Sequence, residues 1–122
     1  MRVKQVKIGI RSLDDALDDF ASTGEAIERG DEVKSRAAGV YFTSLDAFRK
    51  ALTQKRLELL RAIREGKPTS LHQLAKMVHR DIKNVSIDVK YLSQIGLVEL
   101  QEKENRLLPI VDYETIKLDI AV

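Results

Sequence analysis

The chain has 122 residues, of which 43% are hydrophobic and 33% are charged, a balance typical of one globular domain. It has no cysteine, which excludes a disulfide framework and a thiolate metal site. No apolar run reaches the roughly 20 residues of a membrane helix, and the basic N-terminus is interrupted by polar residues, so it is a poor signal peptide. We therefore expect a cytoplasmic protein with no membrane partner.

The net charge of +2 is small, but the positive charge is unevenly distributed. Residues 1–52 hold nine Lys or Arg and nine Asp or Glu, residues 53–106 hold eleven against seven, and residues 107–122 hold one against three. Both histidines also lie in the middle segment. A local excess of this kind suits contact with a polyanion and indicates where phosphate groups would bind.

Residues 1–43 are predicted to form an N-terminal extension. Alternating apolar and polar residues predict a strand over 2–10, and Ser12 begins a predicted amphipathic helix. A short helix is expected within the polar segment 22–38, and β-forming residues predict a brief strand at 40–42. The helix after Ser12 carries an acidic cluster, which suits a solvated face or, alternatively, a docking patch for a basic protein: Asp14, Asp15, Asp18 and Asp19.

Residues 44–111 are predicted to form the main domain, in which four helices each follow a capping residue. The expected caps are Ser44, Thr53, Ser70 and Asp81. The first helix is expected to turn Leu45, Phe48 and Leu52 to one face, and the second to turn Leu57, Leu60 and either Ile63 or the stem of Arg64 inward. Gly66 just past the second helix and Pro68 beyond it are expected to end it.

The predicted third and fourth helices are joined by a turn at 79–80, and Gly96 ends the fourth. Residues 97–101 and 106–111 can then pair across 102–105 as a hairpin, with Pro109 on an edge strand. Residues 112–122 complete the chain with a strand whose apolar residues alternate from Ile116 to Val122. This strand is expected to pack with the N-terminal extension or with a dimer partner.

The spacing L-A-x(9)-V-S-x(5)-L-x(3)-G-L-V, from Leu74 to Val98, resembles the winged-helix regulators of bacteria and archaea, the broad group that includes MarR-like proteins. Residues 42–44, 52–60, 84–86 and 111–116 are similar to a family of small prokaryotic DNA-binding proteins, often encoded beside a toxin gene and then taken to be antitoxins. The resemblance implies an α+β fold: a winged helix-turn-helix with additional N- and C-terminal strands. The chain departs from the family at Gln54, His79 and Ile87, where proline, glycine and arginine are common.

In such a fold the helix after Asp81 would enter the DNA major groove, with its N-terminal half nearest the bases. Its side opposite the stripe from Ile82 to Leu92 carries lysines, which can donate to guanine, and its flank carries an asparagine, which can pair with adenine. The preceding helix and the turn would meet phosphates, and the hairpin would contact a phosphate or enter the minor groove. A solvated helix face and an ordinary polar hairpin tip explain the same residues. The expected DNA contacts are Ser70, His72, Gln73, Arg80, Lys83, Asn84, Ser86, Ile87, Lys90, Lys103 and Arg106.

We expect neither catalysis nor a cofactor, because no nucleophile with its base and no glycine-rich phosphate loop is visible. His72 and His79 lack convergent ligands, so no metal site is expected either. The predicted function is a sequence-specific DNA-binding transcriptional regulator that binds double-stranded DNA as a homodimer. The main alternative is an antitoxin that binds a protein toxin and autoregulates its operon. A third possibility is a winged helix that serves only as a protein scaffold.

Overall fold

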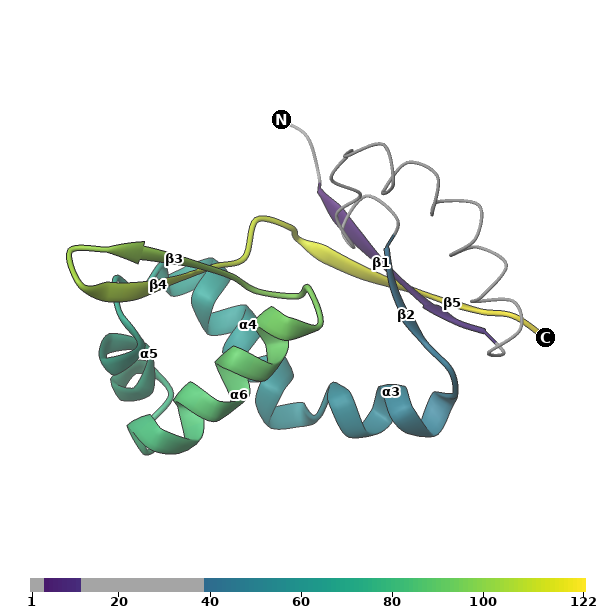
Figure 1. Ribbon diagram of the computed structural model, residues 1–122, viewed down its shortest axis with the longest axis horizontal. Helices are drawn as coiled ribbons and strands as arrows, with labels where there is room; N and C mark the ends of the chain where they lie inside the picture. The colour runs from purple at the N-terminus through teal and green to yellow at the C-terminus, as the bar shows by residue number, and fades with distance from the viewer. Residues whose placement is uncertain (1–3, 12–38) are drawn as a thin grey trace. The chain divides into compact units, whose positions relative to one another are not determined.

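The computed structural model describes residues 4–11 and 39–122 (Figure 1). Within these residues the chain has an α+β fold with four helices and two small sheets. It divides into two compact units, one formed by Met1–Lys4 and Leu52–Glu114 and the other by Gln5–Ala51 and Thr115–Val122. The boundaries predicted from the sequence instead fall after residues 43 and 111. The helix expected after Ser12 and the short helix expected within 22–38 lie outside the described residues.

The first unit contains α4 (Gln54–Gly66), α5 (Leu71–Met77), α6 (Ile82–Gln94) and a hairpin of β3 (Glu99–Lys103) and β4 (Arg106–Ile110). Each helix begins where a side-chain oxygen accepts a hydrogen bond from a free backbone N–H of the first turn, as predicted. The caps are Thr53 to the amide of Arg56 (3.2 Å), Ser70 to that of Gln73 (3.1 Å) and Asp81 to that of Lys83 (3.1 Å).

One face of each of these helices is buried in a shared core. Of the α6 residues predicted to face inward, Val85, Val89 and Leu92 are fully buried, whereas Ile82 is only half-buried. On α4 the prediction was wrong in part, because Leu57 is only half-buried and Leu59 is fully buried in its place. Arg64 does not turn inward either: it is exposed and lies 3.4 Å from the Glu114 carboxylate.

The end of α4 also differs from the prediction. Gly66 is the last helical residue, and the left-handed position falls on Lys67, with φ 45° and its N–H bonded to the Ile63 carbonyl at 3.1 Å. A Cβ atom at Gly66 would lie 3.0 Å from the Met77 sulfur of α5. A side chain at this exposed position would therefore require the flexible end of Met77 to shift by a few tenths of an ångström.

The hairpin starts two residues later than predicted, because Leu97 and Val98 are buried in the core at the end of α6. Gly96 has φ 93°, and this left-handed position ends the helix as expected. The turn is tight, with Glu104 and Asn105 at φ 53° and 63°, the conformation that matches the twist of a two-residue hairpin. Lys103 pairs with Arg106 across it.

The second unit contains β1 (Gln5–Ile10), β2 (Val40–Phe42), α3 (Leu45–Ala51) and β5 (Thr115–Ile120). The three strands are parallel in the order β2-β1-β5. Strand β1 begins at Gln5, whereas the sequence predicted a start at residue 2. Lys4 belongs to the other unit. Helix α3 begins after Ser44, whose Oγ accepts from the Ala47 amide at 3.0 Å, but Leu45 is 46% exposed rather than packed.

The register of the sheet separates an apolar face from a polar face. Because directly paired residues share a face, Val6, Ile8 and Ile10 of β1 lie beside Ile116, Leu118 and Ile120 of β5 and beside Val40 and Phe42 of β2. The terminal strands thus pair within one chain, one of the two arrangements left open by the sequence. The apolar face is buried at Ile8 but 43% exposed at Leu118.

Candidate nucleic-acid interface

A hollow of about 680 Å³ lies between the start of α5, the first half of α6 and the tip of the hairpin. Lys76 and Arg106 supply positive charge, and the His72 imidazole lies among them. No Asp or Glu is among its lining residues, so the wall has no carboxylate to repel an anion. The lining residues are Thr69, Ser70, Leu71, His72, Gln73, Lys76, Ile82, Ser86, Asn105, Arg106 and Leu107. We call this hollow the basic groove.

A second hollow of about 650 Å³ lies against the turn between α5 and α6. His72, Lys76 and Ile82 line both hollows, so the outer side of α5 faces two adjoining depressions. The turn itself contains His79 with φ 55°, a left-handed conformation that side chains with a Cβ atom seldom adopt.

Two of the predicted contacts in the basic groove already have a structural role. The Ser70 hydroxyl accepts from the Gln73 amide, and the Gln73 side-chain oxygen accepts from the Thr69 amide at 2.6 Å. These bonds resemble a capping box at the start of α5, except that the Gln73 side chain reaches the amide of Thr69, one residue before the cap. The Ser70 and Gln73 side-chain oxygens therefore already accept hydrogen bonds within the chain. The charged groups that the groove offers to an anion are Lys76 and Arg106.

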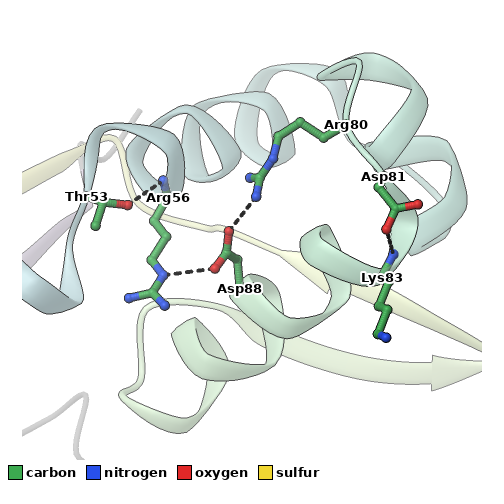
Figure 2. Close-up of polar contacts among 6 residues, drawn as sticks. All are labelled: Thr53, Arg56, Arg80, Asp81, Lys83 and Asp88. Carbon is green, nitrogen blue, oxygen red and sulfur yellow. Dashed lines mark hydrogen bonds and ion pairs between the residues drawn. The ribbon is translucent and has the colours of Figure 1, made fainter.

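Arg80 is directed into the unit by an ion-pair network (Figure 2). Asp88 of α6 accepts from Arg80 Nη2 at 2.8 Å through one carboxylate oxygen and from Arg56 Nε of α4 at 3.1 Å through the other. All three side chains are less than one-fifth exposed, at 18%, 17% and 19% for Arg80, Asp88 and Arg56. The Asp88 bridge thus fastens α6 to α4 and to the turn. Arg80 was predicted to contact DNA, but its guanidinium is paired with Asp88 instead.

Sequence reasoning missed Arg56 and Asp88 entirely. Their side chains meet across 32 residues of chain, and the Arg56 guanidinium also lies over the Tyr91 ring at 4.2 Å. Lys76 and Asn105 were missed as well, although a signal existed for Lys76. It follows His72 by four residues, which places both on one face of a helix.

The outer face of α6 presents Lys83, Asn84, Ile87 and Lys90, all exposed, with Ile87 56% exposed. The amide of Lys83 is held by the Asp81 cap while its side chain extends from the helix (Figure 2). Lys103 is exposed on the hairpin. These five predicted contacts lie outside the basic groove, whereas Ser70, His72, Gln73, Ser86 and Arg106 line it.

Two further features bear on the expected partners. In the described part of the chain, no three His, Asp or Glu side chains come close enough to hold a metal ion. None of the helices that the structure describes is both long and apolar enough to cross a membrane. The acidic cluster from Asp14 to Asp19 lies outside the described residues.

Comparison with known proteins gives a family. A search of curated proteins finds no match to this chain. A family model matches residues 51–118, which is more than half of the chain and includes α4, α5, α6, the hairpin and most of β5. The chain therefore belongs to the HVO_A0114 family.

Proposed function

We propose that this chain is a winged helix-turn-helix transcriptional regulator that binds double-stranded DNA sequence-specifically as a homodimer. In this proposal α5, the turn and α6 form the helix-turn-helix, and β3 and β4 form the wing. Helix α6 enters the major groove, and the wing contacts the neighbouring backbone. The order and capping of these elements support the proposal.

The observation that carries it is the basic groove beside α6. Its two cations come from different elements, Lys76 from α5 and Arg106 from the hairpin, and its lining contains no carboxylate. A phosphate backbone carries one negative charge per nucleotide, so cations on two sides of one depression would strengthen its binding.

Base reading is assigned to the exposed face of α6. The ammonium of Lys83 can donate to guanine O6 and N7, and the amide of Asn84 can pair with adenine. Ile87, 56% exposed, offers an apolar contact for a thymine methyl group. The Asp88 bridge supports this reading indirectly, because a helix fastened to α4 presents these side chains in a fixed orientation.

Selection of bound sequences from a random pool of duplex DNA tests the proposal. We expect the full-length protein to enrich a motif of two half-sites, because a symmetric dimer presents two copies of α6. The Lys76→Ala/Arg106→Ala variant should retain little DNA. The matched control is Lys55→Ala, which removes an exposed lysine of α4 that lines neither hollow and should leave the enriched motif unchanged.

Retention of no duplex at low salt by the folded wild-type protein would overturn the proposal. Equal retention by the groove variant and the control would overturn the assignment of the basic groove. Enrichment of duplex without any common motif would leave a DNA-binding protein but contradict sequence-specific reading by α6.

A further inference from the structure

Among the residues that the structure describes, strand β5 lies at an edge of the sheet and carries exposed apolar side chains on one face. Among the described residues the sheet order is β2-β1-β5, so β5 pairs on one side only. Leu118 is 43% exposed and Ile120 is 46% exposed. An open strand edge with apolar side chains invites pairing with another strand.

The backbone of β5 is oriented for such pairing. The Ala121 N–H donates to the Ile10 carbonyl at 3.0 Å, and Ile10 is aligned with Ile120. Along a parallel strand, successive residues turn their N–H and C=O groups alternately toward and away from the neighbour. This alternation turns the amides and carbonyls of Ile116, Leu118 and Ile120 away from β1 and toward the open edge.

The charges of β5 are not balanced within the sheet. Lys117 is aligned with Lys7 of β1, so two like charges lie side by side on the polar face. Lys7 pairs with Asp119 at 3.2 Å, and Lys117 has no ion pair with any residue that the structure describes. A carboxylate beyond the open edge would therefore complete the charge pattern of this face.

A second copy of β5 supplies that carboxylate in one particular register. If antiparallel strands align Leu118 with Leu118, then Ile116 faces Ile120 and Lys117 faces Asp119 of the other copy. A shift by two residues in one direction places Lys117 opposite itself, and a shift in the other direction places Asp119 opposite itself. Like charges directly opposite each other are destabilising, so only the register centred on Leu118 matches both the apolar and the charged residues.

We propose that two copies of this chain dimerise by antiparallel pairing of their β5 strands, with the two-fold axis at Leu118. The two sheets then form one continuous sheet whose apolar face extends across the axis. Lys117 and Asp119 occupy the pairs without direct hydrogen bonds, where opposite side chains approach most closely. This inference deepens the homodimer part of the proposed function. Its tests contain no DNA, so its failure is distinguishable from failure of DNA binding.

A cysteine scan measures the register, because the native chain contains no cysteine to interfere. In the proposed pairing, the two copies of position 118 have Cα atoms about 5.5 Å apart, which suits a disulfide. The full-length Leu118→Cys variant should therefore give a covalent dimer on mild oxidation. The controls Lys117→Cys and Asp119→Cys should cross-link far less, since each reports one of the shifted registers.

Charge reversal measures the pairing itself by sedimentation. Lys117→Asp places two carboxylates opposite each other at each end of the pair, and Asp119→Lys places two lysines there. Each single change should raise the dimer dissociation constant roughly tenfold or more, because two ion pairs change sign. The Lys117→Asp/Asp119→Lys double variant restores opposite charges and should dimerise like the wild type.

Three results would overturn the proposal. One is a full-length protein that stays monomeric at tens of micromolar. Another is a dimer that neither single charge reversal weakens, which would place the interface elsewhere. The last is cross-linking that is stronger at position 117 or 119 than at 118, which would contradict the register.

Discussion

An ion-pair network of the helical unit differs in burial from two ion pairs of the sheet unit. In the helical unit, Asp88 joins Arg56 and Arg80 with all three side chains less than one-fifth exposed. In the sheet unit, Asp46 and Lys50 form a pair with side chains 74% and 78% exposed, and Asp119 and Lys7 form another that is more than half exposed. Water and salt screen the exposed pairs, whereas removal of Asp88 would leave the charges of two largely buried arginines without their shared partner.

A second difference concerns the surfaces that each unit leaves open. The helical unit buries its apolar stripe and presents charged and polar side chains at the basic groove and on α6. The sheet unit presents apolar residues at an unpaired strand edge. The first kind of surface suits a polyanion and the second suits another strand, so each unit has its own proposed partner.

Removing one ion-paired aspartate from each unit tests whether burial determines what an ion pair contributes to stability. Asp88→Ala leaves two arginines without their shared carboxylate, and it should lower the free energy of unfolding by about 2–3 kcal/mol. Asp46→Ala should change it by less than about 0.5 kcal/mol, because that pair is solvated. Urea denaturation followed by circular dichroism measures both. Equal losses from the two variants would show that exposure does not govern their contributions.

Substitutions of two lysines of the helical unit distinguish base reading from phosphate contact. If Lys83 reads a base, Lys83→Ala should weaken binding to the selected duplex by roughly 1–3 kcal/mol and relax the preference at one position. Lys103→Ala should weaken binding about equally on all sequences, because a hairpin lysine would meet phosphate. Fluorescence anisotropy on matched and single-substituted duplexes distinguishes them. Equal, sequence-independent losses from both variants would remove base reading from Lys83.

A buried tyrosine of the helical unit and an exposed tyrosine of the sheet unit allow the same comparison for a hydroxyl group. The Tyr113 hydroxyl donates to the Leu97 carbonyl at 2.7 Å, and Tyr113 is only 4% exposed. Tyr113→Phe leaves that carbonyl without this donor and should lower the free energy of unfolding by about 1 kcal/mol. Tyr41 of the sheet unit is 41% exposed, and Tyr41→Phe should be close to neutral in the same denaturation experiment. A neutral Tyr113→Phe would contradict the importance of this contact.

The smallest expected effect is a gain at the turn between α5 and α6. His79 has φ 55°, and a left-handed conformation costs a residue with a Cβ atom roughly 1–2 kcal/mol. His79→Gly removes this strain but adds freedom to the unfolded chain, so a net stabilisation of about 0.5 kcal/mol is expected. His79→Ala keeps the strain and is the control. A gain that alanine matches would have another origin.

Local features were the most predictable part of the molecule. The caps at Ser44, Thr53, Ser70 and Asp81 all formed, because a cap needs only a short polar side chain and the backbone amides that follow it. Gly96 also ended its helix as predicted. By contrast, Gly66 was expected just past its helix, but it is the last helical residue and the left-handed position falls on Lys67.

Contacts between distant segments were not predictable in the same way. The Asp88 bridge joins α4, the turn and α6, and no sequence pattern pairs Arg56 with Asp88. The apolar alternation of β1 and β5 predicted two strands but not that β1 lies between β2 and β5. Of the candidate site, the exposed residues of α6 followed from helical periodicity. The basic groove needed the hairpin brought beside α5, which only the structure provides.

The salt dependence of DNA binding tests the central proposal most directly. The logarithm of the association constant should fall linearly with the logarithm of salt concentration, with a slope set by the number of phosphates contacted. The Lys76→Ala/Arg106→Ala variant should have a shallower slope by about 0.9 per lost contact, and Lys55→Ala should keep the wild-type slope. Identical slopes for all three proteins, each shown to be folded, would contradict a phosphate-binding role for the basic groove.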